Sequence, residues 1–125
     1  MSDEPSDPRR PRSYQDLDVW RDGIGLVRDI YVLAQSWPSD ERFGLISQIR
    51  RAAVSVPSNI AEGWGRHKRG EFDQFLRYAR GSLFEVDTQL VIAVEVGIAQ
   101  QREVDDLRQR IDVLSRRLGA LRRSL

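Results

Sequence analysis

The stretch of sequence that decides the fold runs from Glu41 to Arg69 and reads ERFGLISQIRRAAVSVPSNIAEGWGRHKR. Its apolar and small residues recur every three or four positions, a spacing that places them on one face of an α-helix. They are Leu45, Ile46, Ile49, Ala52, Ala53, Val56 and Ile60. The pattern predicts an amphipathic helix whose apolar face packs on a core. The opposite face carries Arg42, Gln48, Arg50 and Arg51.

A proline interrupts this helix at position 57. Pro57 has no N–H to donate to the carbonyl of Ala53, and its ring crowds that carbonyl. An interior proline therefore costs about 3 kcal/mol or bends the helix. Three small polar residues flank it: Ser55, Ser58 and Asn59. Their side chains could bond the freed backbone groups, so we expect a helix that bends at Pro57 and ends in a Gly-Trp-Gly turn at residues 63–65.

Three further segments show helical spacing of apolar residues, at about residues 16–35, 70–96 and 101–121. Ser39 or Asp40 is a suitable N-cap for the second helix. Gly97 and Ile98 suit the end of the third. No segment alternates with a period of two, so no strand is expected. Because the connections are short, the sequence predicts an all-α, antiparallel up-down-up-down four-helix bundle over residues 14–125, preceded by a disordered tail at residues 1–13.

The predicted helices carry more apolar residues than one inner face requires. For the first helix we expect an inner face of Trp20, Ile24, Val27, Ile30 or Tyr31, and Ala34. The surplus on this helix comprises Leu17, Val19, Leu26, Ile30 and Val32. On the third helix it comprises Phe72, Tyr78, Leu83, Phe84, Val91, Ile92 and Val94. Surplus apolar surface usually marks a subunit contact, so we expect a homo-oligomer.

Composition narrows the functional class. The chain has 125 residues and no cysteine, which fits a cytoplasmic protein and excludes thiolate chemistry. No apolar run is long enough to span a membrane, so no membrane partner is expected. His67 is the only histidine, and no Glu-x-x-His pair provides a di-metal site. We therefore expect no enzyme activity, no metal and no cofactor.

Charge is distributed unevenly along the chain. Residues 42–80 hold eight basic and three acidic residues, a net charge of +5. Residues 107–125 hold six arginines and one aspartate, which again gives a net charge of +5. The two remaining segments, residues 1–41 and 81–106, are both acidic. The arginines near the C-terminus, Arg116, Arg117, Arg122 and Arg123, are expected to complement the dipole at the end of their helix.

The basic residues of the first segment are the strongest functional feature. We select Arg50, Arg51, Arg66, Lys68, Arg69, Arg77 and Arg80 as candidates for nucleic-acid binding. A concentrated positive patch gains affinity for phosphates by releasing counterions. The alternative is that residues 66–69 form a solvated loop, with Arg69 close to Glu71 and Asp73.

Several residues around this patch have structural and functional interpretations. Trp64, beside Gly63, could stack on a base, although packing across the bundle end is the commoner role. Asn59 and Glu62 could belong to a site. Backbone repair near Pro57, or pairing of Glu62 with Arg77 or Arg80, is the simpler explanation.

Three segments resemble a known family. They read YQDLDVW at residues 14–20, QIRRAAVSVPSNIAEG at 48–63 and FLRYARGSLFE at 75–85. They resemble the small bacterial four helix bundle protein family, which includes proteins encoded in intervening sequences of large-subunit rRNA genes and accessory variability determinants of diversity-generating retroelements. The similarity runs from about Tyr14 to Ile98. It implies a four-helix bundle that assembles into a ring-like homopentamer and binds nucleic acid.

Two functional classes follow. The first is a non-catalytic oligomer that binds RNA or DNA through the basic patch with little sequence preference. The second is a protein-interaction scaffold, whose arginines meet an acidic partner, a neighbouring subunit or a reverse-transcriptase-like protein. Salt-dependent binding of random nucleic acid favours the first, and retention of one protein without nucleic acid favours the second.

Overall fold

The structure, a computed structural model, describes residues 11–125 and contains four long helices. They are α1 (Asp18–Gln35), α2 (Leu45–Gly65), α3 (Arg69–Glu95) and α4 (Gln101–Arg123), with short 3-10 helices at Tyr14–Asp16 and Ser39–Glu41. These described residues include no strand, which confirms the all-α, four-helix prediction. The predicted tail lies largely on residues 1–10, outside the described part. Ser13 is the N-cap of the first 3-10 helix and accepts a hydrogen bond from the N–H of Gln15.

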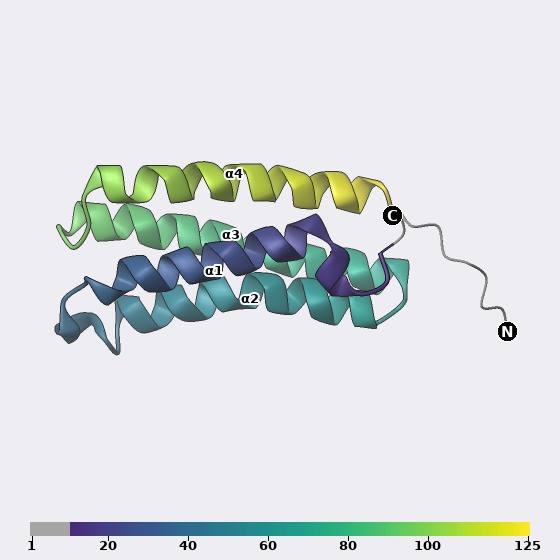
Figure 1. The fold of residues 1–125 in the computed structure, drawn as a ribbon, viewed down its shortest axis with the longest axis horizontal. Coiled ribbons are helices and arrows are strands. Elements are labelled where there is room, and N and C mark those ends of the chain that lie inside the picture. The colour runs from purple at the N-terminus through teal and green to yellow at the C-terminus, as the bar shows by residue number, and fades with distance from the viewer. Residues whose placement is uncertain (1–10) are drawn as a thin grey trace, which may run out of the picture.

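The helices form a closed ring of neighbours. α2 packs against α1 and α3, and α4 packs against α3 and α1, while the backbones of helices on opposite corners do not approach each other closely. The colour in Figure 1 runs along α1 away from the end where the C-terminus lies, returns along α2, and repeats this course through α3 and α4. The α2–α3 connection therefore lies at the same end as the C-terminus, and the other two connections lie at the far end (Figure 1).

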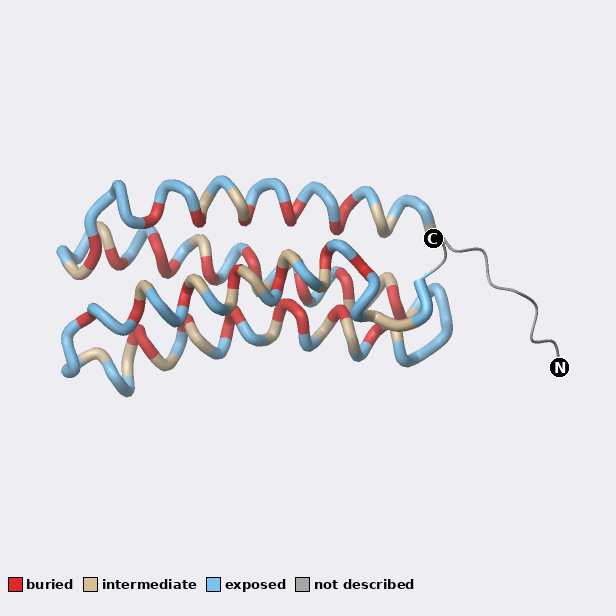
Figure 2. Tube along the Cα trace, in the orientation of Figure 1, coloured by how far each residue is buried: buried red, intermediate tan, exposed pale blue. Residues whose placement is uncertain are grey.

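Each helix turns its buried residues towards the centre, and its outer face is exposed (Figure 2). The inner faces of α3 and α4 follow the predicted three-and-four spacing. On α4 the fully or almost fully buried residues are Val104, Leu107, Ile111, Leu114 and Leu118. Burial of one such side chain contributes about 1.5–3 kcal/mol. The core therefore extends along the whole bundle and leaves the outer faces available for binding.

The inner face of α1 was predicted correctly at Ile30 and Ala34, but its first half was predicted one position out of register. The buried residues are Val19, Gly23, Leu26, Ile30 and Ala34, whereas the predicted Ile24 and Tyr31 are exposed. The reason is Gly23, where a Cβ would lie 3.4 Å from the ring atoms of Pro57 on α2. Glycine adds nothing to an apolar periodicity, yet it lets α1 and α2 approach closely and fixes the rotation of α1.

Part of the predicted surplus of apolar residues on α1 and α3 is buried in the core rather than exposed. Leu17, Val19, Leu26, Ile30, Phe72 and Leu83 belong to the core of the bundle. The predicted surplus residues that are exposed are Val32 on α1 and Tyr78, Phe84, Val91 and Ile92 on α3.

The start of α2 also differs from the prediction. The predicted N-caps, Ser39 and Asp40, instead form the separate 3-10 turn after Pro38. α2 begins at Leu45, whose N–H donates to the carboxylate of Glu41 at 3.2 Å. A carboxylate at this position satisfies one of the N–H groups that a helix start leaves unpaired. The residues between the two helices, Arg42 and Phe43, are exposed.

α2 continues as one helix through Pro57 to Gly65, so the predicted Gly-Trp-Gly turn is wrong. The chain turns at His67 instead, which has a φ of 58°, in the left-handed region. Asn59 donates to the carbonyl of Ser55 at 2.8 Å, and the Ser55 hydroxyl donates to the carbonyl of Ala52 at 2.7 Å. Neither bond goes to the carbonyl of Ala53, the group that Pro57 leaves without its helical partner, so these two bonds do not provide the expected repair of that carbonyl. The bend itself stays a prediction.

The end of α3 confirms its predicted cap. Gly97 has a φ of 82°, and its N–H donates to the carbonyl of Val94 at 3.1 Å. The N–H of Ile98 donates to the carbonyl of Ala93 at 2.8 Å, which completes a Schellman motif. Within residues 11–125, no helix is long and apolar enough to cross a membrane.

Candidate nucleic-acid interface

Most arginines of α4 are neutralised by aspartates. The pairs to neighbouring helices are Arg108–Asp87, Arg110–Asp29, Arg117–Asp22 and Arg122–Asp73, and Arg116 pairs with Asp112 on α4 itself. They join α4 to α1 on one side and to α3 on the other. The predicted role of Arg117 and Arg122, pairing with the helix dipole, therefore gives way to ion pairs between helices.

Two of these pairs shift the pKa of a partner. The hydrogen bond from Arg110, at 2.6 Å, lowers the pKa of Asp29 below its usual value, and partial burial opposes this effect. Arg108 binds both carboxylate oxygens of Asp87, at 2.8 and 3.3 Å, which raises the pKa of Arg108. These charges are engaged in partly exposed ion pairs between helices.

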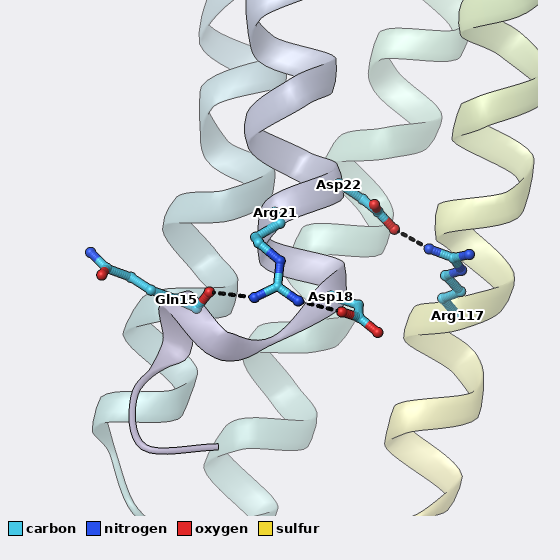
Figure 3. A network of polar contacts seen from close by, with 5 residues as sticks. All are labelled: Gln15, Asp18, Arg21, Asp22 and Arg117. Carbon is cyan, nitrogen blue, oxygen red and sulfur yellow. Dashed lines mark hydrogen bonds and ion pairs between the residues drawn. The ribbon is translucent and has the colours of Figure 1, made fainter. Parts of the chain in front are cut away.

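A cleft between α1 and α4 contains further arginines, but each has a carboxylate partner. Arg21, Arg28, Arg110 and Arg117 line the cleft. In Figure 3, Arg21 reaches the carbonyl of Gln15 and the carboxylate of Asp18, and Asp22 points towards Arg117. Arg28 pairs with Asp29 at 3.3 Å. Because its positive charges are compensated, this cleft is a poor site for an anion.

Three of the predicted nucleic-acid-binding residues lie together at the α2–α3 connection. We call Arg66, Lys68 and Arg69 the turn cluster. Arg66 lies within ion-pair distance of Glu62 at 3.4 Å and Glu71 at 3.7 Å. Glu62 was predicted to pair with Arg77 or Arg80, and Arg66 is its partner instead. Lys68 pairs weakly with Glu71 at 3.9 Å, whereas Arg69 has no carboxylate within ion-pair distance among residues 11–125.

Arg77 and Arg80 do not join the turn cluster. Arg77 is exposed on α3 and lies 3.9 Å from a carboxylate oxygen of Asp73. Arg80 is turned towards α4, where its Nε donates to the hydroxyl of Ser115 at 3.0 Å. A helix rises 1.5 Å per residue, so Arg80 lies about 16 Å along α3 from Arg69.

Arg50 and Arg51 belong to a different region, near the start of α2. Arg51 lies about 22 Å along α2 from Arg66, at the opposite end of the bundle. There the two arginines join three residues that the sequence pattern did not single out as site residues: Tyr31, Arg42 and Phe43. We call these five residues the groove cluster, because they line one open groove between the end of α1 and the start of α2.

Two arginines of the groove cluster each lie close to an aromatic ring. The guanidinium of Arg50 lies 4.7 Å from the centre of the Tyr31 ring, and that of Arg42 lies 5.8 Å from the centre of the Phe43 ring. Arg51 donates to the hydroxyl of Ser47 at 2.8 Å. Among the described residues, none of the three arginines has a carboxylate within ion-pair distance. A signal was present in the sequence, since Phe43 is a large apolar residue outside the periodic pattern.

Trp64 packs at the other end of the bundle. It is half-buried against the core, and its ring meets that of Phe72 edge-to-face at 6.0 Å. Gly63 is buried beside it, close to Phe75. A small pocket here is lined by Trp64, His67, Lys68, Arg69 and Leu125, among others. In the described part of the chain, no three His, Asp or Glu side chains are grouped so that they could hold a metal ion.

Comparison with known proteins identifies the family. The family model described as 23S rRNA-intervening sequence protein matches residues 15–120. This range covers α1, α2, α3 and all but the last three residues of α4, and it extends beyond the three segments that carried the resemblance. No curated protein matches the sequence significantly. The chain belongs to the 23S rRNA-intervening sequence protein family.

Proposed function

We propose that this protein is a non-catalytic, cytoplasmic oligomer that binds nucleic acid, with RNA as the natural ligand, through its uncompensated basic surface and with little sequence preference. The choice of RNA draws on the name of the family to which the chain belongs. We propose no catalysed reaction, because the sequence has a single histidine and no cysteine.

One observation carries the proposal: the two basic segments differ in how their charge is compensated. Within residues 107–125, five of the six arginines have a carboxylate partner, and Arg123 is the exception among the described residues. Within residues 42–80, three of the eight basic residues have such a partner: Arg66, Lys68 and Arg77. Five have none in the described part of the chain: Arg42, Arg50, Arg51, Arg69 and Arg80. Phosphate contacts need positive charge of this kind, which no carboxylate holds.

Self-association would strengthen such binding. Four large apolar residues of α3 are exposed: Tyr78, Phe84, Val91 and Ile92. We call these four residues the strip on α3 and propose that they belong to a subunit contact; the number five comes from the family resemblance alone. A closed ring of antiparallel bundles, each with α2 bent at Pro57, would present the basic surface several times. Repetition raises the avidity for a long polyanion without any new type of interaction.

The turn cluster provides a direct test, because Arg69 has no carboxylate partner in the described part of the chain and the ion pairs of Arg66 and Lys68 are long and exposed, at 3.4–3.9 Å. Replacement of Arg66, Lys68 and Arg69 together by Ala should weaken binding to all RNA sequences alike. It should also make the salt dependence shallower by about 0.7–0.9 for each phosphate that the variant no longer binds. Fluorescence anisotropy with labelled RNA of random sequence measures both. A variant with Arg28 and Arg116 replaced by Ala removes two exposed arginines that already have carboxylate partners, and it should bind almost as the wild type does.

The results also distinguish the second functional class. If the wild-type protein retains no RNA at low salt but captures an acidic or reverse-transcriptase-like protein, the scaffold function replaces the proposal.

Circular dichroism of the triple variant must show unchanged helical content, since the side chains of Arg66, Lys68 and Arg69 are exposed on the surface.

A further inference from the structure

The groove cluster combines two features that rarely occur together on the surface of a helical bundle. The first is exposed aromatic surface: Phe43 is 89% exposed, the largest exposed fraction among the apolar side chains of the described residues, and Tyr31 is 38% exposed. The second is positive charge, from Arg42, Arg50 and Arg51, that no described carboxylate compensates. These five residues, together with Val54 and the neighbouring serines, line an open groove of about 760 Å³.

The geometry of the arginines favours a planar anionic ligand. The guanidinium of Arg50 is stacked over Tyr31, and its Nε is buried without a hydrogen-bond partner among the described residues. The contact with the ring holds the guanidinium at the groove, while no described carboxylate compensates its charge. Phe43 lies in the segment that joins the 3-10 helix Ser39–Glu41 to α2, and the guanidinium of Arg42 lies close to its ring. The groove therefore offers aromatic faces next to cations.

We propose that this groove binds a single-stranded stretch of RNA, with a base stacked on Phe43 and phosphates bound by Arg42, Arg50 and Arg51, while Tyr31 holds the guanidinium of Arg50. This inference rests on the proposed RNA-binding function and names its ligand class and its site. Aromatic rings beside a positive groove are the usual platform for single strands, because every base has a face that can stack. Sequence-specific hydrogen bonding is not required.

A duplex fits the groove less well than a single strand does. Bases in an A-form helix are stacked on one another, so their faces are not available to an exposed phenylalanine. A duplex could meet the arginines through its phosphates, yet it would leave Phe43 in water. An acidic peptide would also satisfy the arginines but has no flat surface for the rings. The aromatic residues therefore decide in favour of unstacked nucleotides.

The two carboxylates that precede Arg42, Asp40 and Glu41, do not line the groove. Glu41 is already engaged, since it accepts the N–H of Leu45 at the start of α2.

The test uses the full-length protein and two fluorescein-labelled probes, a short oligouridylate and an RNA duplex of matched length. Phe43→Ala should bind the oligouridylate roughly 5- to 150-fold more weakly, the range for loss of one stacked base, and should bind the duplex unchanged. Phe43→Trp should restore the affinity. Because Phe43 is almost fully exposed, neither variant should lose stability.

A second pair of variants tests the cations. Arg51→Ala should weaken binding and lower the salt slope for the single strand by about 0.7. Arg102→Ala, which removes an exposed arginine from α4, should change neither. The inference is overturned if Phe43→Ala binds the oligouridylate as the wild type does, if both probes are affected equally, or if polyglutamate competes as well as the oligouridylate. If the wild type binds neither probe, the proposed function itself fails.

Discussion

A Cβ atom built on Gly63 would lie 2.6 Å from the Cβ of Phe75, so α2 and α3 approach too closely at this level for any side chain larger than hydrogen. Gly63→Ala sets two effects against each other. Alanine favours the helix by up to about 1 kcal/mol, but overpacking costs about 1–3 kcal/mol. We expect overpacking to dominate, because a backbone-attached atom of Phe75 cannot move aside. Urea unfolding should show a net loss of stability.

Gly65→Ala is the matched control for this prediction. Gly65 lies on the same helix two residues later, and a Cβ there would meet nothing within 4 Å. This variant should be as stable as the wild type or more stable. Equal stability changes in the two variants would contradict the close approach of α2 and α3.

The pair of Asp29 and Arg110 should make stability depend on pH. Arg110 lowers the pKa of Asp29 in the folded protein, so folding favours the ionised carboxylate. The resulting stabilisation is present above the unfolded pKa of about 3.9 and is lost as the pH falls through the lower folded pKa. Asp29→Asn should therefore cost at most about 1 kcal/mol near neutral pH, since both side chains are partly exposed.

Unfolding in urea at neutral pH and again well below pH 4 measures this effect. The difference between Asp29→Asn and the wild type should shrink at acid pH. Asp18→Asn, which alters a more exposed pair with Arg21, is the control and should have a smaller effect. A difference that stays constant with pH would mean that the carboxylate charge is irrelevant.

Pro57 is expected to direct the last turns of α2. Its ring packs against Gly23 of α1, and Trp64 lies about two turns further along the helix. Pro57→Ala restores the missing hydrogen bond and removes the bend, so the environment of Trp64 should change. The indole N–H resonance of Trp64 reports this directly. An unchanged resonance together with raised stability and unchanged assembly would show that the proline bends nothing.

The exposed strip on α3 should control assembly. Phe84→Glu places a charge in the middle of this apolar surface, and burial of an unpaired charge opposes association. Light scattering at micromolar concentration should give an oligomer for the wild type and a smaller species for the variant. Val96→Ala, at the end of α3, is the control. A wild-type monomer would refute the proposed self-association.

The sequence predicted those parts of the fold that depend on side chains with a regular period. The inner faces of α3 and α4 and the glycine cap at Gly97 are all encoded by residues a few positions apart. The register of α1 was missed because Gly23 acts by the absence of a side chain. The start of α2 was missed because the N–H of Leu45 is bound by the carboxylate of Glu41, four residues earlier, instead of by a short polar N-cap residue.

The candidate site was harder to predict, because charge along the sequence does not reveal which charges are compensated in space. The basic segment at residues 107–125 is matched by aspartates of α1 and α3 that lie far away in sequence, such as Asp29 opposite Arg110. Arg50 and Arg66 share a helix but lie at opposite ends of the bundle. Tyr31 and Arg50 come together only because α1 packs on α2.

Binding of labelled random-sequence RNA over a series of salt concentrations is the measurement that tests the central claim most directly. The wild-type protein should bind at low salt, and the logarithm of its affinity should fall linearly and steeply with the logarithm of the salt concentration. The variant of the turn cluster should give a shallower line. No binding at low salt, or tight binding that is independent of salt, would contradict the proposal that uncompensated arginines of this bundle hold nucleic acid.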